Sequence, residues 1–378
     1  MDKKQLKNID LLKPFLRGPL PLTPDNFTPV ARTPWGGIYI ASHLKKDICP
    51  EKLGHIVGES WDFSCEPSFP SKILGSKVTL NELIQSFPEE LLSLAYLETK
   101  GKNCEILVKI LNAAEDLSLQ VHPSDDDPYL KAEECGKFES WYVLHAEEKS
   151  GIYLGFKEGV RKEQFEEALK KGGDSIRPLL NFVAVKAGDY FEIPYGTCHA
   201  IGKGLVVIEP QHVLASKKGK TYRIHDWGRR YNAEGSLDPK GNSRELHIEE
   251  ALRLIDPEKQ SGEEFLNKLR GAVQVQTLAE GLRIETFGKN DFYKFHRVGM
   301  RKQQTLSLKL EGAFAAMIPV EGSFAIRTHE GLDSYWQKGQ PGFLSAASFP
   351  LRFKAFEDSV LFLISPEGVR ESWHLTEA

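Results

Sequence analysis

The stretch Gly188–Ala200 constrains the fold of this chain most strongly, and it reads GDYFEIPYGTCHA. Its aromatic and branched residues predict a short β-strand, which ends at Pro194. Gly196 permits a tight turn after the strand, because glycine accepts backbone conformations that other residues avoid. The turn directs His199 back across a sheet. This arrangement is typical of a β-structure that positions a ligand.

A second stretch, Leu117–Pro123, reads LSLQVHP and alternates apolar with polar residues. Side chains two positions apart on a strand project from the same face. Gln120 and His122 therefore share one face of the predicted strand, while the apolar residues occupy the other. We expect His199 to join them, so that three donors converge.

Short β-type runs broken by glycine continue through most of the chain after residue 104, which predicts β-barrels or sandwiches. Helical patterns interrupt them at three places. A capping-box spacing at Thr79–Glu82 predicts a helix start, Arg161–Lys171 is amphipathic, and Asn242–Arg270 has a helical period with a break. We also expect a short β-like run at Ile38–Ala41, and a loop with a short helix at Ser124–Lys137 that could cover the site.

At 378 residues the chain exceeds a usual single core, so we expect two domains. The converging imidazole and amide groups are of the kinds that can hold a metal ion. We assign residues 1–240 to a β domain with this candidate metal site, 241–271 to a helical connector, and 272–378 to a second, smaller β domain.

The second domain has its own analogue of the Gly188 stretch, beginning at Gly339. When Gly339 is set against Gly188, Pro350 stands where His199 stands. The ligand is missing, so we expect a degenerate copy and one metal per chain.

Composition and charge argue against two classes of partner. The formal net charge is −4 with 49 Lys and Arg residues, so nothing in the balance indicates a nucleic-acid partner. No apolar run approaches the roughly 18 to 20 residues that cross a bilayer, so we expect no membrane partner. The N-terminus lacks the apolar core and cleavage site of a secretion signal, which favours a cytoplasmic protein.

The five cysteines are odd in number, scattered and without C-x-x-C spacing, which predicts free thiols. Cys198 lies beside His199, but adjacent strand residues face opposite ways. We therefore interpret Cys198 as a buried small apolar residue and not as a ligand.

Glu139 opens a further predicted strand and completes a candidate metal site. A lone histidine in a strand is more often a hydrogen-bonded core residue than a ligand. Together with Glu139, the residues Gln120, His122 and His199 favour a metal site over histidines that are only hydrogen-bonded in the core. One amide oxygen, two imidazoles and one carboxylate suit Zn²⁺, although Fe²⁺, Mn²⁺ and Co²⁺ accept the same donors.

These stretches together resemble the type I phosphomannose isomerases of the cupin superfamily. The resemblance is carried by LSLQVHP, by GKFESWY at Gly136–Tyr142, by PYGTCHAIGKG at Pro194–Gly204, and by TYR with DWGR at Thr221–Arg229. It implies two cupin-type, jelly-roll-like β-barrels and a bound zinc ion. It also implies a sugar phosphate substrate, with interconversion of mannose 6-phosphate and fructose 6-phosphate.

The resemblance also implies roles for three further residues. The residue matching Arg223 is the assigned active-site residue, Lys137 matches a lysine of the site, and Ser118 matches a hydroxyl near the substrate. One departure lies just before Thr221, where the chain has HVLASKKGK in place of a shorter polar link.

Isomerisation of an aldose to a ketose needs an acid–base group and a cation that stabilises the enediolate. Glu209 and Lys137 are the candidates for the base. Arg223 either clamps the phosphate or stabilises the enediolate charge. Lys109 is either a snorkelling lysine or a charge that lines the site, where it would bind substrate.

Two other functions fit a cupin with these ligands. An iron-dependent dioxygenase would need bound iron and would consume oxygen. A cupin that binds sugar phosphates without turnover would show saturable binding only.

Overall fold

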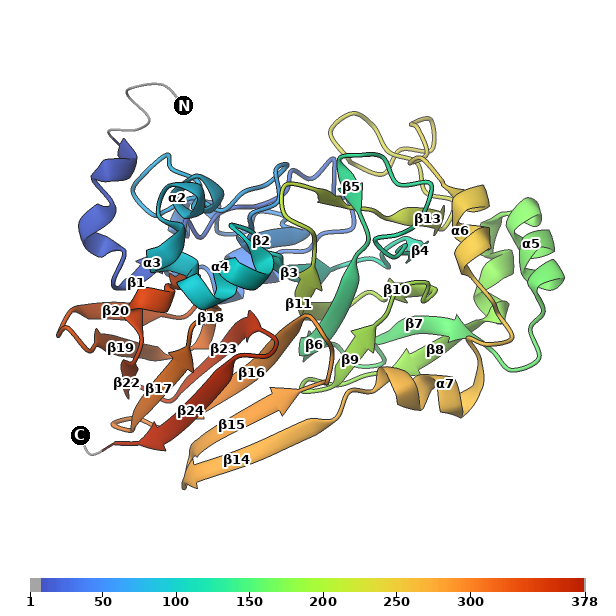
Figure 1. The fold of residues 1–378 in the computed structure, drawn as a ribbon. Coiled ribbons are helices and arrows are strands. Elements are labelled where there is room, and N and C mark those ends of the chain that lie inside the picture. The colour runs from blue at the N-terminus through green and yellow to red at the C-terminus, as the bar shows by residue number, and fades with distance from the viewer. Residues whose placement is uncertain (1–7, 377–378) are drawn as a thin grey trace.

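The computed structural model describes residues 8–376, and the chain folds into two pairs of β-sheets with short helices at their margins (Figure 1). In the first pair, one sheet has the order β13 (Tyr222–His225), β4 (Leu119–Val121), β10 (His199–Ile201), β7 (Gly151–Phe156), β8 (Leu180–Ala184). The other has the order β2 (Glu59–Phe63), β3 (Ile106–Ala113), β11 (Leu205–His212), β6 (Phe138–Ala146), β9 (Tyr190–Ile193). Two short strands, β5 (Glu134–Cys135) and β12 (Lys218–Gly219), pair beside them.

The second pair is built mainly from the C-terminal part of the chain. Its larger sheet has the order β1 (Pro19–Pro21), β21 (Gly342–Leu344), β18 (Ala315–Glu321), β23 (Ser359–Pro366), β16 (Tyr293–Met300), β15 (Leu282–Phe287), β14 (Val273–Ala279). Its smaller sheet has the order β20 (Asp333–Gln337), β19 (Ser323–Thr328), β22 (Leu351–Ala355), β17 (Thr305–Glu311), β24 (Arg370–Leu375). Because β1 pairs with β21, the start of the described chain belongs to this second pair (Figure 1).

The sheets are flanked by the α-helices α2 (Leu80–Ser86), α3 (Pro88–Leu92), α4 (Leu94–Lys100), α5 (Lys162–Lys171), α6 (Ile248–Leu254), α7 (Gly262–Leu269). Shorter helical turns are η1 (Lys13–Phe15), η2 (Ile40–Leu44), η3 (Pro50–Lys52), η4 (Gly173–Leu179), η5 (Ala346–Ser348). The helices predicted from the capping box, from the amphipathic stretch and from the interrupted period are all confirmed. Within residues 8–376 no helix combines the length and apolar character needed to span a bilayer.

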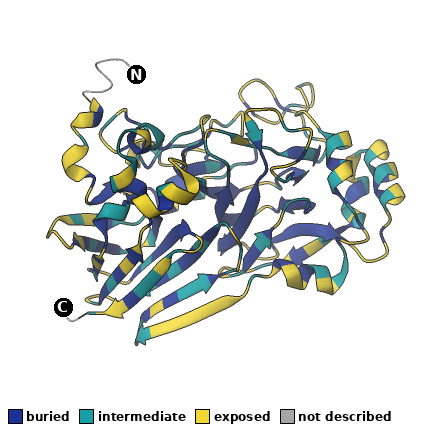
Figure 2. Cartoon of the chain, viewed as in Figure 1, coloured by how far each residue is buried: buried dark blue, intermediate teal, exposed yellow. Residues whose placement is uncertain are grey.

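The two pairs share a hydrophobic core, which appears as the dark interior of Figure 2. Alternation along β6 builds this contact. Trp141 and Val143 face the interior of the first pair, whereas Tyr142 packs on Phe362 of the second pair with ring centroids 4.7 Å apart. Strand β6, which carries Glu139, is therefore covered from behind by the second pair.

The predicted fold class is confirmed: the chain is mainly β, with two jelly-roll-like sheet pairs, and each pair consists of stacked sheets that do not close into one continuous barrel. All five cysteines are buried free thiols, as predicted. Cys198 packs in an apolar cluster with Tyr222 and Ile224.

Two local predictions are wrong. Ile38–Ala41 does not form a β-like run, because Ile40, Ala41 and Leu44 are buried from one helical turn, η2. No helix forms within residues 124–137, which the structure describes in full. There the side chain of Asp127 accepts a hydrogen bond from the backbone of Tyr129, and such local bonds compete with a helix.

Candidate active site

Strand register places three of the predicted residues side by side. In the sheet that carries β4, Gln120 lies opposite His199 of β10 on one side and opposite Arg223 of β13 on the other. The turn at Gly196 has a φ of +79° and its backbone N–H donates to the carbonyl of His122 at 2.8 Å. Glycine is suited to this turn, which fixes the direction from which His199 enters the sheet.

The predicted metal ligands meet between the two sheets. His122, Glu139 and His199 are buried, and their ligand atoms lie within 4.8 Å of one another. His122 Nε2 is 3.2 Å from Glu139 Oε1, and His199 Nε2 is 3.8 Å from Glu139 Oε2. The amide of Gln120 donates to His199 Nε2 at 3.3 Å. Within residues 8–376 no other group of three His, Cys, Asp or Glu residues has this geometry.

Backbone carbonyls orient both imidazoles. His122 Nδ1 donates to the carbonyl of Lys220 at 3.1 Å, and His199 Nδ1 donates to that of Thr197 at 2.8 Å. Each Nε2 is therefore left without a proton and faces Glu139. A second hydrogen bond of this kind is the usual way to fix the tautomer of a ligating histidine.

Burial of the histidines and the charges around Glu139 keep the donors in the protonation state that a metal requires. Burial and the neighbouring His122 lower the pKa of His199 to about 3, and burial also lowers the pKa of His122. The pKa of Glu139 is well below its usual value, because the attraction of His122 and Lys137 outweighs burial. All three are deprotonated at neutral pH, as metal ligands must be.

The donor atoms also fit a metal because two of them lack hydrogen-bond partners. His122 Nε2 and Glu139 Oε2 are buried without one. Buried polar atoms are rarely left unpaired, since each unpaired atom is costly. Two imidazole nitrogens, a carboxylate and an amide oxygen form a donor set that Zn²⁺ accepts.

Lys137 is held as a cation beside this centre. Its Nζ lies 2.8 Å from Glu139 Oε1 and donates to Thr221 Oγ1 at 3.3 Å. Burial acts to lower the pKa of Lys137, but the attraction of Glu139 and Glu209 outweighs it, so the pKa is raised. The side chain lines the pocket as a charged group.

Glu209 lies on β11 opposite Lys109 of β3, and its carboxyl group is bound from three sides. Trp141 Nε1 donates to Oε1 at 3.0 Å, Gln211 Nε2 donates to Oε2 at 2.6 Å, and Lys109 Nζ is 3.9 Å from Oε2. Burial and the nearby charge of Glu139 raise the pKa of Glu209 to about 8. A carboxyl group that exchanges a proton near neutral pH is suited to general acid–base catalysis.

Arg223 is a cation that no carboxylate within residues 8–376 neutralises by direct contact. Its Nε donates to Ser118 Oγ at 3.2 Å and its Nη1 to the carbonyl of Glu245 at 2.9 Å. Burial and the charge of Arg244 lower its pKa to about 10, which still leaves it charged at neutral pH. The guanidinium group is thus fixed by neutral acceptors and available to an anionic ligand.

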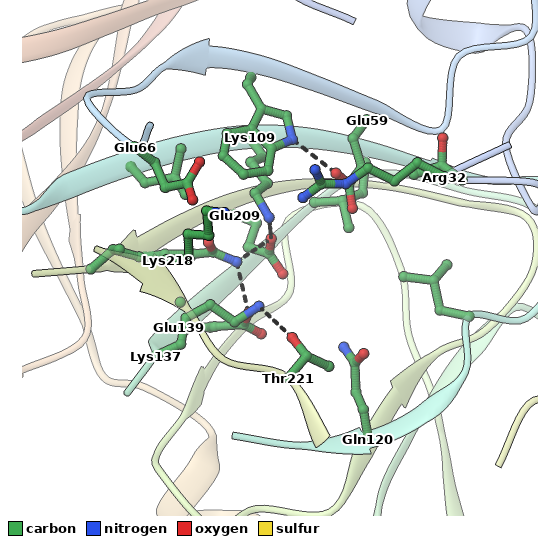
Figure 3. Close-up of a pocket in the computed structure, with 18 of the residues that line it drawn as sticks. Arg32, Glu59, Glu66, Lys109, Gln120, Lys137, Glu139, Glu209, Lys218 and Thr221 are labelled. Carbon is green, nitrogen blue, oxygen red and sulfur yellow. Dashed lines mark hydrogen bonds and ion pairs between the residues drawn. The ribbon is translucent and has the colours of Figure 1, made fainter. Parts of the chain in front are cut away.

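A cavity of about 440 Å³ opens beside these groups (Figure 3). Seven of the nine residues predicted for the site line it: Lys109, Ser118, Gln120, Lys137, Glu139, Glu209, Arg223. The other two, His122 and His199, are not among its lining residues. Figure 3 shows Gln120 and Glu139 at one end and Arg32 with Glu59 at the other.

Several lining residues were not predicted for the site. Trp61 lies on strand β2, where it lines the cavity with its ring centroid 4.3 Å from Lys109 Nζ. Arg244 lies in an irregular segment with no pattern to identify it, and it reaches the cavity because Asp226 binds its guanidinium at 2.6 Å. Arg32 and Lys218 also line the cavity, and only the fold brings them there.

Comparison with known proteins shows a family and several relatives that this chain resembles. Residues 28–167 match the family model of the phosphomannose isomerase type I catalytic domain. The chain is 33% identical over 225 residues to a mannose-6-phosphate isomerase of Streptococcus mutans, an alignment that covers 58% of this chain and 64% of that relative. The aligned stretch therefore spans just under two thirds of the relative's length.

Solved structures share the fold along nearly the whole chain. The mannose 6-phosphate isomerase of Bacillus subtilis superposes with a TM-score of 0.73 at 24% identity, covering 92% of this chain and 99% of that one. A mannose 6-phosphate isomerase crystallised with zinc and yttrium has a TM-score of 0.65 at 17% identity, covering 92% and 98%. At these identities the likeness establishes the fold.

The buried imidazoles predict a pH-dependent stability for the metal-free protein. An unfolded histidine takes up a proton below about pH 6.5, whereas folded His199 does not, so stability should fall as the pH decreases. His199 alone should remove about 1 kcal/mol between pH 6.5 and 5.5. Chemical unfolding of chelator-treated protein across this range measures the slope.

Two variants separate this effect from general acid sensitivity. His199→Asn should flatten the slope, whereas His374→Asn, at an exposed position, should keep it. An equal slope in the wild-type protein and in His199→Asn would contradict a neutral buried imidazole.

Proposed function

We propose that this chain, whose residues 28–167 match the family model of the phosphomannose isomerase type I catalytic domain, interconverts mannose 6-phosphate and fructose 6-phosphate. The observation that carries this proposal is the meeting of His122, Glu139 and His199 beside a cavity that also holds Glu209 and the unneutralised Arg223. A generic ligand-binding β-domain has no need of a cavity with both a metal-ligand set and a carboxyl group of raised pKa.

The resident cofactor in this proposal is one Zn²⁺ ion per chain, held by Gln120, His122, Glu139 and His199. Support comes from the two unpartnered buried donor atoms and from the neutral state of both imidazoles. The related isomerase crystallised with zinc supports the choice of metal. When bound, zinc supplies a redox-inert Lewis acid that polarises the substrate carbonyl.

The proposed proton transfer uses Glu209. A base removes the proton on C2 of the open-chain aldose and an enediolate forms. A proton returns to C1, and the hydroxyl proton passes from O2 to O1, which gives the ketose. Glu209 fits this role because its pKa lies near neutrality and its side chain lines the cavity. Lys137 is a poorer base, because Glu139 raises its pKa, and we assign it to stabilising negative charge.

Three further residues bind the substrate in this account. Arg223 gives the negative charge of the enediolate or of the phosphate a fixed cation. Ser118 keeps Arg223 in place by accepting its Nε–H. Lys109 places a second positive charge, besides that of Arg223, in the cavity; its ammonium group lies next to Glu209 and packs against the ring of Trp61.

A coupled assay of mannose 6-phosphate conversion tests the function directly. Turnover should proceed equally under nitrogen, should stop when a chelator removes the metal, and should return with Zn²⁺. His199→Ala should lose both metal and turnover, because the variant lacks one imidazole.

Cys198→Ala is the matched control, since Cys198 faces the apolar cluster and not the metal site; it should keep both metal and turnover. Oxygen consumption with bound iron would indicate a dioxygenase instead. Saturable binding of mannose 6-phosphate with no turnover would indicate a sugar-phosphate-binding protein.

Arg223 variants separate two roles for this cation. Arg223→Ala should lower kcat by roughly 100- to 1000-fold at saturating substrate if the guanidinium stabilises the enediolate. Arg223→Lys should retain more activity, because it keeps the charge but loses the planar fork. A loss confined to a raised KM would assign Arg223 to the phosphate instead.

Metal content should remain normal in both variants, because Arg223 is not a ligand. Arg230→Ala is a suitable control, since Arg230 is exposed on the segment that follows. Wild-type kcat and KM in Arg223→Ala would remove this residue from the mechanism.

A further inference from the structure

A second hollow lies on the outer face of the sheet formed by β20, β19, β22, β17 and β24, and it shares no residue with the active-site cavity. Its volume is about 540 Å³. The floor is low because small residues, Ala325 and the buried Thr305, lie between taller side chains. Tyr335 and Phe356 form a wall, with ring centroids 6.0 Å apart and an interplanar angle of 19°.

Two cations of β22 line this hollow. Arg352 and Lys354 are two positions apart, so they project from the same outer face, while the intervening Phe353 packs in the core. Neither cation has an ion-pair or hydrogen-bond partner within residues 8–376. Arg327, in the neighbouring strand, is by contrast held by Asp333 through two bonds of 2.7 and 2.6 Å.

A buried hydroxyl of the floor also lacks a partner. Thr305 is only 3% exposed, and its Oγ1 has no hydrogen-bond partner. Register places Thr305 directly opposite Lys354, and Lys354 opposite Ala325. Thr305, Lys354 and Ala325 therefore lie side by side across three neighbouring strands of the floor.

The two rings of the aromatic wall are exposed to solvent, and this exposed apolar surface does not stabilise the fold. Tyr335 is 61% exposed and Phe356 is 39% exposed. Stacked aromatic side chains beside polar groups offer an apolar face to a flat or ring-shaped ligand. The hollow thus combines an apolar face with two cations, Arg352 and Lys354, that have no partner within residues 8–376.

We propose that this hollow binds a monosaccharide phosphate, independently of the active site. The phosphate group complements Arg352 and Lys354, because a guanidinium and an ammonium group are the usual partners of a phosphate. The sugar ring lies against the exposed faces of Tyr335 and Phe356. A volume of about 540 Å³ suits a ligand of this size.

Calorimetric titration with methyl α-D-mannopyranoside 6-phosphate tests the proposal, because the ring of this sugar cannot open and no turnover occurs. The full chain should show a binding event that Arg352→Ser and Lys354→Ser each weaken by about 10-fold or more. Tyr335→Ser should weaken the same event. Lys309→Ser is the matched control: Lys309 lies on the same sheet outside the hollow and pairs with Glu311 at 2.7 Å.

Two control ligands and a variant of the active site show whether the binding is specific to this hollow. Methyl α-D-mannopyranoside without phosphate should bind far more weakly, and inorganic phosphate should bind without sensitivity to Tyr335→Ser. The binding event that is lost in Arg352→Ser should persist in Arg223→Ala. Arg352→Ser should retain wild-type isomerisation. Failure of the proposed function and failure of this site therefore give different results.

Two outcomes would overturn the proposal. One is the absence of any event that depends on Arg352. The other is equal affinity for inorganic phosphate and the sugar phosphate, which would make the hollow a simple anion contact.

Discussion

The buried carboxylate of Glu139 is the constraint on which the rest of the site depends. It is 1% exposed, and a charge in such a place is costly unless partners compensate it. Lys137 and Gln211 contact one of its oxygens, and both candidate histidine ligands face it. The other oxygen has no hydrogen-bond partner, so the compensation is incomplete without a further cation. The same negative charge raises the pKa of Glu209, which couples the candidate metal centre to the candidate base.

Alternate side chains on a strand face opposite sides of its sheet, so one sheet contributes both to the site and to the core between the two sheet pairs. Glu139 and Glu209 face the cavity, whereas the next residue of each strand, Ser140 or Pro210, faces the second sheet pair. The hydroxyl of Tyr293 lies 2.9 Å from Ser140 Oγ and donates to the carbonyl of Pro210 at 2.9 Å. The C-terminal half thereby closes the back of the strands that carry the acidic residues and excludes water from that side.

The residues that sequence patterns identified best are those whose roles follow from local geometry. Gln120 and His122 share a strand face, and a glycine turn precedes His199, so their convergence could be inferred without a structure. Arg244 could not, because it reaches the cavity only through its contact with Asp226, which no local pattern encodes. The helical turn η2 was missed for a similar reason: its apolar residues are buried by distant segments.

Domain limits are the other part of the fold that local patterns describe incompletely. The division into residues 1–240, 241–271 and 272–378 stays a prediction. Strand β1 pairs with β21, more than 300 residues later in the chain, and such a contact leaves no periodic signal in either segment. The register that places Arg223 beside Gln120 is likewise a product of long-range pairing.

The central claim is that Gln120, His122, Glu139 and His199 form a single metal centre. Anomalous diffraction from crystals of the chain loaded with zinc, recorded above and below the zinc absorption edge, tests it most directly. The account predicts one strong anomalous peak per chain, within bonding distance of His122 Nε2, His199 Nε2 and a carboxylate oxygen of Glu139. A peak held by other residues, or no peak between these three side chains, would contradict it.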